Sequence, residues 1–292
     1  MNSQVRVGIF ADVNCKGGVV TKLDPYSITN KLDAKAIGSI TTRLEARGEN
    51  PYFQKMLTDY LDALEPAKLN RVLEVGCGTG VATRALARHP AFCGHISASD
   101  LSEELVEAAK KLANDEGCAG RITFSTGDAL ALEGDEKYDA VIAHTVISHV
   151  PDYRKFIAGL AKSVVDTGTI AIFDGDYASI TLGAENPNHG AAFSSAIIDG
   201  IITNPTIMRE MPWLAKEQGL QVKRSFSYLL SEIGTARFFA DMFPSLPVLL
   251  PKAGVADEAE VKKWVDQQMA FSSEGTFFGS INFYTYLLAP RR

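Results

Sequence analysis

The chain has 292 residues, a net charge of −6, 46% hydrophobic residues and 22% charged residues, a composition typical of a globular enzyme. No run of Lys or Arg is longer than two, so the electrostatic footprint of a nucleic-acid-binding protein is absent. The four cysteines show no C-x-x-C spacing, which argues against a zinc site and a disulfide framework. No stretch reaches the roughly 18 apolar residues that a membrane span needs. We therefore expect a soluble, cytoplasmic protein without nucleic-acid or membrane partners.

The first 65 residues are predicted to form a leader followed by helices. Within residues 1 to about 24, "VRVGIF" could form a short strand, whereas Gly17 and Gly18 suggest a loosely held leader. The pattern from Ser27 to Leu64 is helical, with apolar residues at three- and four-residue spacing. Glu65 and Pro66 end this region.

Strands and helices then alternate up to Tyr177. Apolar runs predict five strands, at residues 71–76, 95–100, 121–128, 138–146 and 168–174. Amphipathic patterns predict three helices between them, at 81–88, 102–117 and 152–165. Such alternation indicates βαβ units with helices on both faces of a parallel sheet.

After Asp176 the alternation breaks. Residues 178–212 are rich in Gly, Asn and Ser, and then the pattern predicts a helix at 204–219, a strand at 220–230, a helical region at 235–271 and a closing strand at 277–289. We expect an α/β, Rossmann-like, doubly wound sheet, mostly parallel with an antiparallel C-terminal strand, plus an N-terminal helical lid and an inserted helical cap. The corresponding regions are residues 1–65, 66–177 and 178–292.

The stretch "VLEVGCGTG" (residues 72–80) raises the question of which ligand it holds. A dinucleotide site needs G-x-G-x-x-G, but Val81 stands where that pattern wants glycine, and no Gly-Lys-Ser/Thr follows as in a P-loop. Glu74 would repel a pyrophosphate and attract an ammonium or sulfonium group. The loop therefore favours a cationic ligand.

These residues resemble the class I S-adenosylmethionine-dependent methyltransferases, small-molecule type, similar to the ubiquinone/menaquinone enzymes. The resemblance runs from about residue 50 to 177, through "LEVGCGTG", Asp100, "GDA" at 127–129, "AHTVISHV" at 143–150 and "SVVDTGTIAIFDGDY" at 163–177. It implies that the glycine loop bends around the methionine and ribose parts of S-adenosyl-L-methionine, that Asp100 accepts both ribose hydroxyls and that Asp128 bonds the adenine amino group.

The resemblance also implies a set of cofactor-binding residues, and for two of them a purely structural role is the alternative. Asp100 could simply cap the following helix, and Asp128 could be an ordinary turn residue. In the small-substrate members the N-terminal helices fold over the cofactor, so that Tyr26, Arg43 and Arg47 could reach the methionine carboxylate. The expected cofactor-binding residues are Glu74, Gly76, Cys77, Gly78, Gly80, Asp100, Leu101, Gly127, Asp128, Ala129, His144, Arg47 and Tyr26.

Methyl transfer needs a base only when the nucleophile arrives protonated. The candidates for catalysis are His149, His144 and Asp174, at the ends of the fourth and fifth strands. Each histidine could instead be a packed structural residue, and His144 is better suited to touching cofactor than to taking a proton. Asp174 and Asp176 could orient a hydroxyl or an amine, bind a metal or merely solvate a turn. We expect no metal.

The sequence thus predicts methyl transfer to O, N, S or C of a small, apolar or aromatic metabolite, by a monomer or homodimer. The apolar character is suggested by Met and aromatic residues after position 205, for which ordinary helix packing is the competing explanation; they are Met208, Met211, Trp213, Phe238, Phe239, Met242 and Phe243. The alternative function is a non-methylating cyclisation or isomerisation by a cofactor-binding protein of the same fold.

Overall fold

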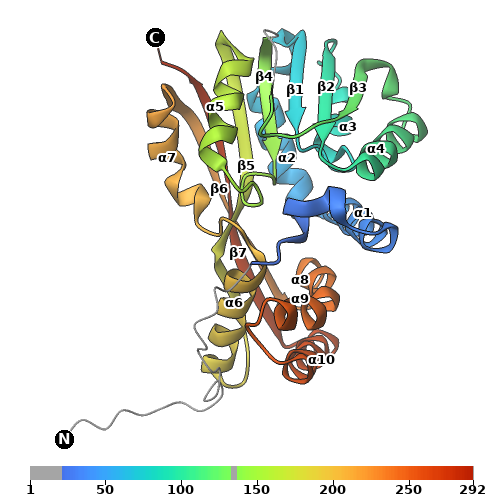
Figure 1. Cartoon of the computed structure of the whole chain (residues 1–292), viewed down its shortest axis with the longest axis vertical. Coiled ribbons are helices and arrows are strands. Elements are labelled where there is room, and N and C mark those ends of the chain that lie inside the picture. Colours follow the sequence, from blue (N-terminus) through green and yellow to red (C-terminus); the bar gives the residue numbers. More distant parts are fainter. Residues whose placement is uncertain (1–21, 133–136, 292) are drawn as a thin grey trace, which may run out of the picture. The chain divides into compact units, whose positions relative to one another are not determined.

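The computed structural model describes residues 22–132 and 137–291 (Figure 1). The "VRVGIF" segment and most of the expected leader lie outside these residues. The chain forms two compact units. The larger unit contains residues 25–176, 203–230 and 282–291, and the smaller unit contains residues 22–24, 177–202 and 231–281.

A seven-stranded sheet has the order β3-β2-β1-β4-β5-β7-β6. The strands are β1 (Arg71–Val75), β2 (His95–Asp100), β3 (Ile122–Thr126), β4 (Tyr138–His144), β5 (Val164–Leu182), β6 (Leu220–Gly234) and β7 (Phe277–Pro290). The first five are parallel, with Leu73 of β1 opposite Ser97 of β2 and Val141 of β4. The predicted parallel, doubly wound arrangement is confirmed.

The closing strand β7 is antiparallel to its neighbours. Gly183 N, after the end of β5, donates to Phe278 O at the start of β7 over 2.8 Å. Arg291 N, after the end of β7, donates to Gly219 O before the start of β6, also over 2.8 Å. The expected antiparallel C-terminal strand is therefore present.

The α-helices begin at recognisable caps. Asp33 accepts from Ala36 N at the start of α1, and Asn50 accepts from Tyr52 N at the start of α2, where Pro51 takes the first helical position. The α-helices are α1 (Ala34–Glu49), α2 (Pro51–Ala63), α3 (Val81–Ala87), α4 (Glu103–Asp115), α5 (Tyr153–Ser163), α6 (Pro187–Ile201), α7 (Ile207–Glu217), α8 (Phe238–Met242), α9 (Leu246–Lys252) and α10 (Glu258–Glu274). Short 3-10 helices are η1 (Pro25–Lys31), η2 (Pro66–Lys68), η3 (Ala119–Arg121) and η4 (Phe243–Ser245).

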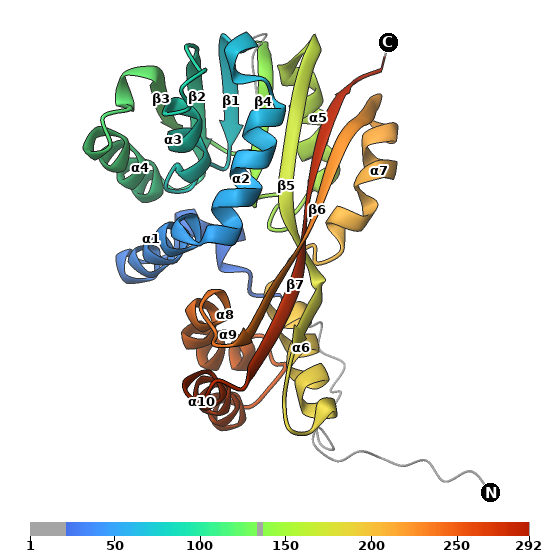
Figure 2. The ribbon, with the colours of Figure 1, turned by 180° about the vertical axis from the view of Figure 1, so that it is seen from behind.

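Helices cover both faces of the sheet in the larger unit. Helices α5 and α7 lie in front of it in Figure 1, whereas α2 lies across the opposite face in Figure 2. The central strands β1 and β4 are buried on both faces, so they read as nearly continuous apolar runs: Val72 and Val75 of β1 are fully buried, as are Val141 and Ala143 of β4. This packing fixes the carboxyl ends of β1, β2 and β4 beside α1 and α2.

One sequence expectation is wrong in extent, and two other regions gain detail. The fifth strand starts at Val164 and runs on to Leu182, so Asp174 and Asp176 lie within a strand and not beside a turn. The Gly-, Asn- and Ser-rich stretch contains the helix α6, and the helical region 235–271 is three helices interrupted by Pro244 and Gly254. Local composition hid these elements because tertiary packing, not propensity, stabilises them.

The apolar residues after position 205 are mostly packed in cores. Met208 and Met211 are fully buried in the cluster formed with α5 and the sheet. In the smaller unit, the rings of Phe239 and Phe243 both pack against Phe277, one tilted and one edge-on. Trp213, by contrast, is 64% exposed. Helix packing therefore accounts for the buried residues, and they do not support an apolar substrate.

A buried arginine joins α3 to two other helices. The Arg84 side chain is only 5% exposed, and its Nη2 donates to both carboxylate oxygens of Glu45, in α1, over 2.7 Å. Its Nη1 pairs with Glu116, at the end of α4. Removing one carboxylate of this part-buried cluster is costly, because it leaves the buried Arg84 charge with one partner fewer.

We predict that Glu45→Ala lowers the free energy of unfolding by about 2 kcal/mol, since it leaves Arg84 with one carboxylate partner in place of two. Urea titration followed by circular dichroism measures the change. Lys55→Ala is the matched control, because Lys55 and Asp59 form an exposed i,i+4 pair whose loss costs only about 0.5 kcal/mol. Equal losses for the two variants would contradict the assignment of a buried anchor.

Candidate functional site

The glycine loop follows β1 and leads into α3. Gly76, Gly78 and Gly80 have φ values of +71°, +54° and +80°, which L side chains rarely adopt. Gly76 N and Cys77 N both donate to Ser99 O, over 2.8 and 2.9 Å. The loop is thereby fixed to the end of β2.

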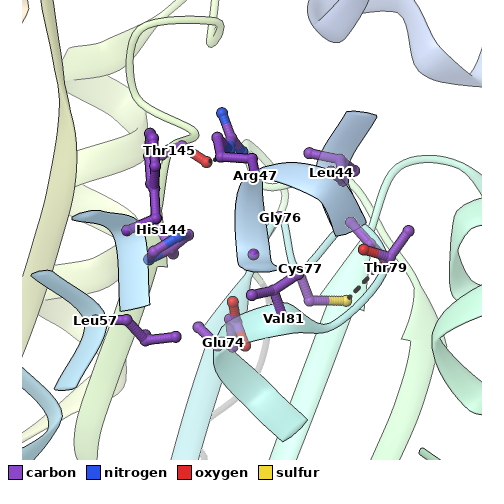
Figure 3. Close-up of a pocket in the computed structure, with 14 residues that line it drawn as sticks. Leu44, Arg47, Leu57, Glu74, Gly76, Cys77, Thr79, Val81, His144 and Thr145 are labelled. Atoms are coloured by element: carbon purple, nitrogen blue, oxygen red, sulfur yellow. Dashed lines mark hydrogen bonds between the residues drawn. The ribbon is translucent and has the colours of Figure 1, made fainter. Parts of the chain in front are cut away.

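A first hollow lies on one side of the loop, between it and the helices α1 and α2 (Figure 3). Its empty volume is about 510 Å³, open solvent included, which suits part of a small ligand. Apolar side chains line much of it, namely Leu44, Phe53, Leu57 and Val81. The predicted site residues Arg47, Glu74, Gly76, Cys77, Gly78 and His144 all line it as well.

The first hollow holds a cation and an acid from different elements. The Arg47 guanidinium donates to Thr145 Oγ1 over 2.8 Å and lies 5.5 Å from the Phe53 ring centroid. Among residues 22–132 and 137–291, no carboxylate forms an ion pair with Arg47. Glu74 is 1% exposed, and its carboxyl accepts a hydrogen bond from Thr83 Oγ1. The pair offers opposite charges to one ligand.

The Glu74 carboxyl changes between its neutral and ionised forms near neutral pH. Burial raises its pKa to about 7, and the charge of Asp100 acts in the same direction. The hydrogen bonds from Thr83 and the charge of Arg84 oppose this rise. A cationic ligand in the hollow would favour the ionised form.

Two further residues of the loop face the first hollow. Burial, with the charges of Glu74 and Asp100, raises the pKa of the Cys77 thiol well above its usual value, so the thiol stays neutral. Thr79 is 1% exposed, and its Oγ1 has no hydrogen-bond partner among the described residues. A buried hydroxyl without a partner is costly, which fits a site completed by a ligand.

His144 ends β4 and also lines the first hollow. Its Nδ1 lies 2.9 Å from the Tyr60 hydroxyl, and its ring stacks on Phe173 at 4.7 Å. Burial lowers its pKa to about 3, with a contribution from the charge of Arg47. His144 is therefore neutral at physiological pH and too weak a base to hold a proton there.

A second hollow lies on the other side of the loop and meets the first at Gly76 and Thr145, which line both. Asp100, at the end of β2, accepts from Gly78 N over 2.7 Å and from Ser102 N over 3.0 Å. Burial raises its pKa, against those backbone hydrogen bonds. The predicted residues Leu101, Gly127, Asp128 and Ala129 line this hollow too.

Asp128 also has the structural role of a turn residue, which was the alternative to cofactor binding. Its Oδ1 accepts from Leu130 N over 2.8 Å, as in an Asx turn. The side chain is exposed and faces the second hollow, so its other oxygen is open to a ligand. Gly80, in contrast, lines neither hollow; it is the N-cap of α3 and lies against Phe124, which leaves little room for a Cβ.

His149 and Tyr26 come together in the second hollow. Their ring centroids are 4.8 Å apart, and His149 is 8% exposed. Tyr26 thus lies apart from Arg47, although the sequence suggested a shared role for them. The Arg43 guanidinium carbon lies 5.9 Å from the centroid of the Tyr26 ring, and Arg43 lines neither hollow.

Asp174 lies behind His149 and does not line the two hollows. It is fully buried, and its carboxylate accepts from Ser148 N over 3.0 Å and from Gly175 N over 2.8 Å. Burial raises its pKa, while the charge of His149 lowers it. Asp176, the next inward residue of β5, instead forms an ion pair with Arg209 of α7. Asp174 is thus placed to orient the loop that carries His149.

Two residues of the site escaped the sequence analysis. Thr145 has a φ of +56°, which is rare and strained for a β-branched residue, and it touches both hollows. Asn204 donates through Nδ2 to Ile147 O and Val150 O, and through its backbone N to Ser148 O. Neither has a sequence signal, because their partners are far away in the chain.

The described residues contain neither a candidate metal site nor a helix that could span a membrane. Within residues 22–132 and 137–291, no group of three or more His, Cys, Asp and Glu residues could hold a metal ion. In the same part of the chain, no helix is both long and apolar enough to cross a bilayer.

Comparison with known proteins identifies the domain that carries these hollows. Residues 72–168 match the methyltransferase domain family. The methyltransferase GfsG of Streptomyces halstedii is 25% identical over 222 residues, covering 73% of this chain and 74% of GfsG. The ubiquinone biosynthesis O-methyltransferase of Xylella fastidiosa is 34% identical over 114 residues, covering 39% of this chain and 45% of that protein.

Among solved structures, a methyltransferase from Geobacter sulfurreducens in complex with S-adenosylhomocysteine is similar in fold. It has a TM-score of 0.54 and 20% identity, and the match covers 89% of this chain and all of that one. Its strand-and-helix core agrees with the sheet described above. The domain match and the methyltransferase relatives show that this chain carries a methyltransferase domain, and its fold is that of the class I S-adenosylmethionine-dependent methyltransferases.

Proposed function

We propose that the enzyme transfers a methyl group to O, N, S or C of a small organic molecule that is apolar or aromatic. The observation that carries this proposal is His149, which lies in the second hollow beside the Tyr26 ring and is electrostatically coupled to the buried Asp174. A histidine held in this way is suited to taking a proton from an acceptor. The proposal therefore favours an acceptor with a protonated nucleophile, such as a hydroxyl.

The residues of the two hollows fit S-adenosylmethionine. Arg47 would bind the carboxylate of its amino-acid part, and Glu74 would bind the ammonium group. The Asp100 carboxylate already accepts backbone hydrogen bonds, and a remaining lone pair would accept from a ribose hydroxyl. The free oxygen of Asp128 would accept from the adenine amino group.

The division of labour follows from the cofactor chemistry. The cofactor, when bound, supplies a methyl group activated by its sulfonium. The protein then has to position the acceptor and exclude water, and it has to remove a proton where one is present. His149 takes the proton, and Asp174, which bonds Ser148 N next to it, keeps the loop oriented.

The choice of a small acceptor draws on the relatives as well as on the residues. One relative is named as an O-methyltransferase of ubiquinone biosynthesis. In this chain, Tyr26 offers an aromatic face next to His149. An aromatic acceptor would stack on such a face.

The alternative, a cyclisation or isomerisation without methyl transfer, is separated from the proposal by one experiment. The enzyme is incubated with methyl-labelled S-adenosylmethionine and a panel of small phenols, hydroxy acids and amines. Label in an organic product supports methyl transfer to a small molecule. Tight cofactor binding without any labelled product, over a broad panel, favours the alternative.

We predict that cofactor binding depends on the ionisation of Glu74. Because its pKa is about 7 in the ligand-free protein and the ligand ammonium prefers the ionised form, affinity is full above pH 7 and is lost as the pH falls through 7. The Kd of S-adenosylhomocysteine should be about tenfold higher at pH 6 than at pH 8. Isothermal titration calorimetry measures it. Glu74→Gln should bind more weakly and lose the pH dependence; a persistent dependence in this variant would assign it to another group.

We predict that His149→Ala lowers kcat by about 100-fold, the usual contribution of a general base. The Kd of S-adenosylhomocysteine should change by less than about threefold, because the contacts proposed for the cofactor come from other residues. Initial rates with an acceptor that the labelling experiment identifies, together with calorimetry, separate the two effects. A large loss of cofactor affinity with unchanged kcat would make His149 a structural residue.

A further inference from the structure

Tyr60 is a buried polar residue in an apolar stripe. It lies on α2 in register with Phe53, Met56 and Leu57, and its exposed fraction is 0%. Its hydroxyl lies 2.9 Å from His144 Nδ1, and the two residues are 84 positions apart in the sequence. An ordinary core position would take phenylalanine, which packs as well and has no hydroxyl to satisfy.

The direction of this hydrogen bond follows from the surroundings of the hydroxyl. Among the described residues, the Tyr60 hydroxyl has no other hydrogen-bond partner. If Nδ1 carried a proton and donated to the hydroxyl, the hydroxyl proton would be buried without an acceptor. Burial and the charge of Glu74 raise the pKa of Tyr60 well above its usual value, so the hydroxyl keeps its proton. Tyr60 is therefore the donor and Nδ1 the acceptor.

The single proton of the neutral imidazole then lies on Nε2. A second proton on Nδ1 is disfavoured because His144 is buried and because the Arg47 guanidinium is nearby. The stack on Phe173, at 4.7 Å and 26°, holds the plane of the ring. His144 lines the first hollow, and its Nε2 forms no hydrogen bond with the described residues.

We propose that Tyr60 is a positioning residue, which fixes His144 as an Nε2–H donor for a carboxylate bound in the first hollow together with Arg47. In the view of this hollow, Arg47 lies above the His144 ring and Glu74 lies below it (Figure 3). The neutral Nε2–H of His144 and the charged guanidinium of Arg47 are two donors that match the two oxygens of a carboxylate. His144 then serves binding and is no general base, which leaves that role to His149.

This inference rests on the proposed function for the position of the cofactor, because a carboxylate at this place has two sources. One is the amino-acid end of the cofactor, and the other is an acidic methyl acceptor. Both present the same chemistry to His144 and Arg47. The experiment has to separate them.

The tautomer is tested without any ligand, by ¹⁵N NMR of the histidine side chains of the whole chain, with the His144 signals assigned from the spectrum of a His144→Gln variant. The wild type should show a protonated Nε2 and an unprotonated Nδ1 for His144 between pH 6 and 8, and Tyr60→Phe should lose this preference. Tyr228→Phe is the matched control, because it also removes a part-buried tyrosine hydroxyl bond, to Asp59 at 2.8 Å. An Nδ1-protonated His144 in the wild type would falsify the proposal.

The ligand is tested by calorimetry with S-adenosylhomocysteine and with 5′-methylthioadenosine, which lacks the amino-acid end. For the cofactor carboxylate, Tyr60→Phe should weaken S-adenosylhomocysteine about fivefold and His144→Phe about tenfold or more, with 5′-methylthioadenosine unchanged within twofold. His144→Gln, whose amide can donate near the position of Nε2, should recover most of the loss, and Tyr228→Phe should match the wild type.

The other results of the binding and kinetic experiments each decide between the two sources of the carboxylate or contradict the proposal. If S-adenosylhomocysteine binding is unaffected but the KM of a carboxylic acid acceptor rises in His144→Phe and recovers in His144→Gln, the carboxylate belongs to the acceptor. If neither ligand class responds, or if both nucleosides weaken equally, His144 is no carboxylate donor and the proposal is wrong. Failure of the wild type to bind S-adenosylhomocysteine would instead count against the cofactor assignment, and the NMR result would still stand.

Discussion

The whole site depends on a steric constraint at three glycines. Side chains from three other elements occupy the space where a Cβ would lie: Val146 at 2.6 Å from the Gly76 position, Leu44 at 3.0 Å from Gly78 and Phe124 at 3.3 Å from Gly80. The loop can therefore be left-handed and still be tightly packed. Because helix α1, strand β3 and the segment after β4 all close on this loop, the two hollows on its sides have fixed walls.

Burial of ionisable groups gives the site its electrical character. Glu74, Asp100 and Asp174 have pKa values raised by burial, and His144 has one lowered by burial, so each is pushed toward its neutral form. A cationic ligand would favour the ionised form of the carboxylates near it. These buried ionisable groups therefore suit a zwitterionic cofactor better than an apolar one.

Much of the fold could be predicted from the sequence, because it depends on local patterns. Strands β1 and β4 are mostly apolar runs, β2 alternates buried and less buried residues, and α4 has a Ser102 cap and an apolar stripe; their bounds agree within two residues. The extension of β5 past Gly175 and the helix α6 were missed, because their residues have weak local preferences and are ordered by packing. For the candidate site, the strand ends could be predicted, since ligands of such sheets bind there. The pairings Arg47–Thr145, Asn204–Ile147 and Tyr60–His144 join residues 98, 57 and 84 positions apart, which no local pattern encodes.

The ion pair between Arg84 and Glu45 has a consequence for the movement of ligands. Glu45 lies on α1 between Leu44 and Arg47, so the turn that lines the first hollow is the turn that Arg84 clamps. Lifting α1 away from the hollow would require separating a bidentate pair from which water is largely excluded. A ligand that left this hollow on the side of α1 would have to open that ion pair first, so its dissociation rate would depend on a contact of helix α3 as well as on the residues that line the hollow.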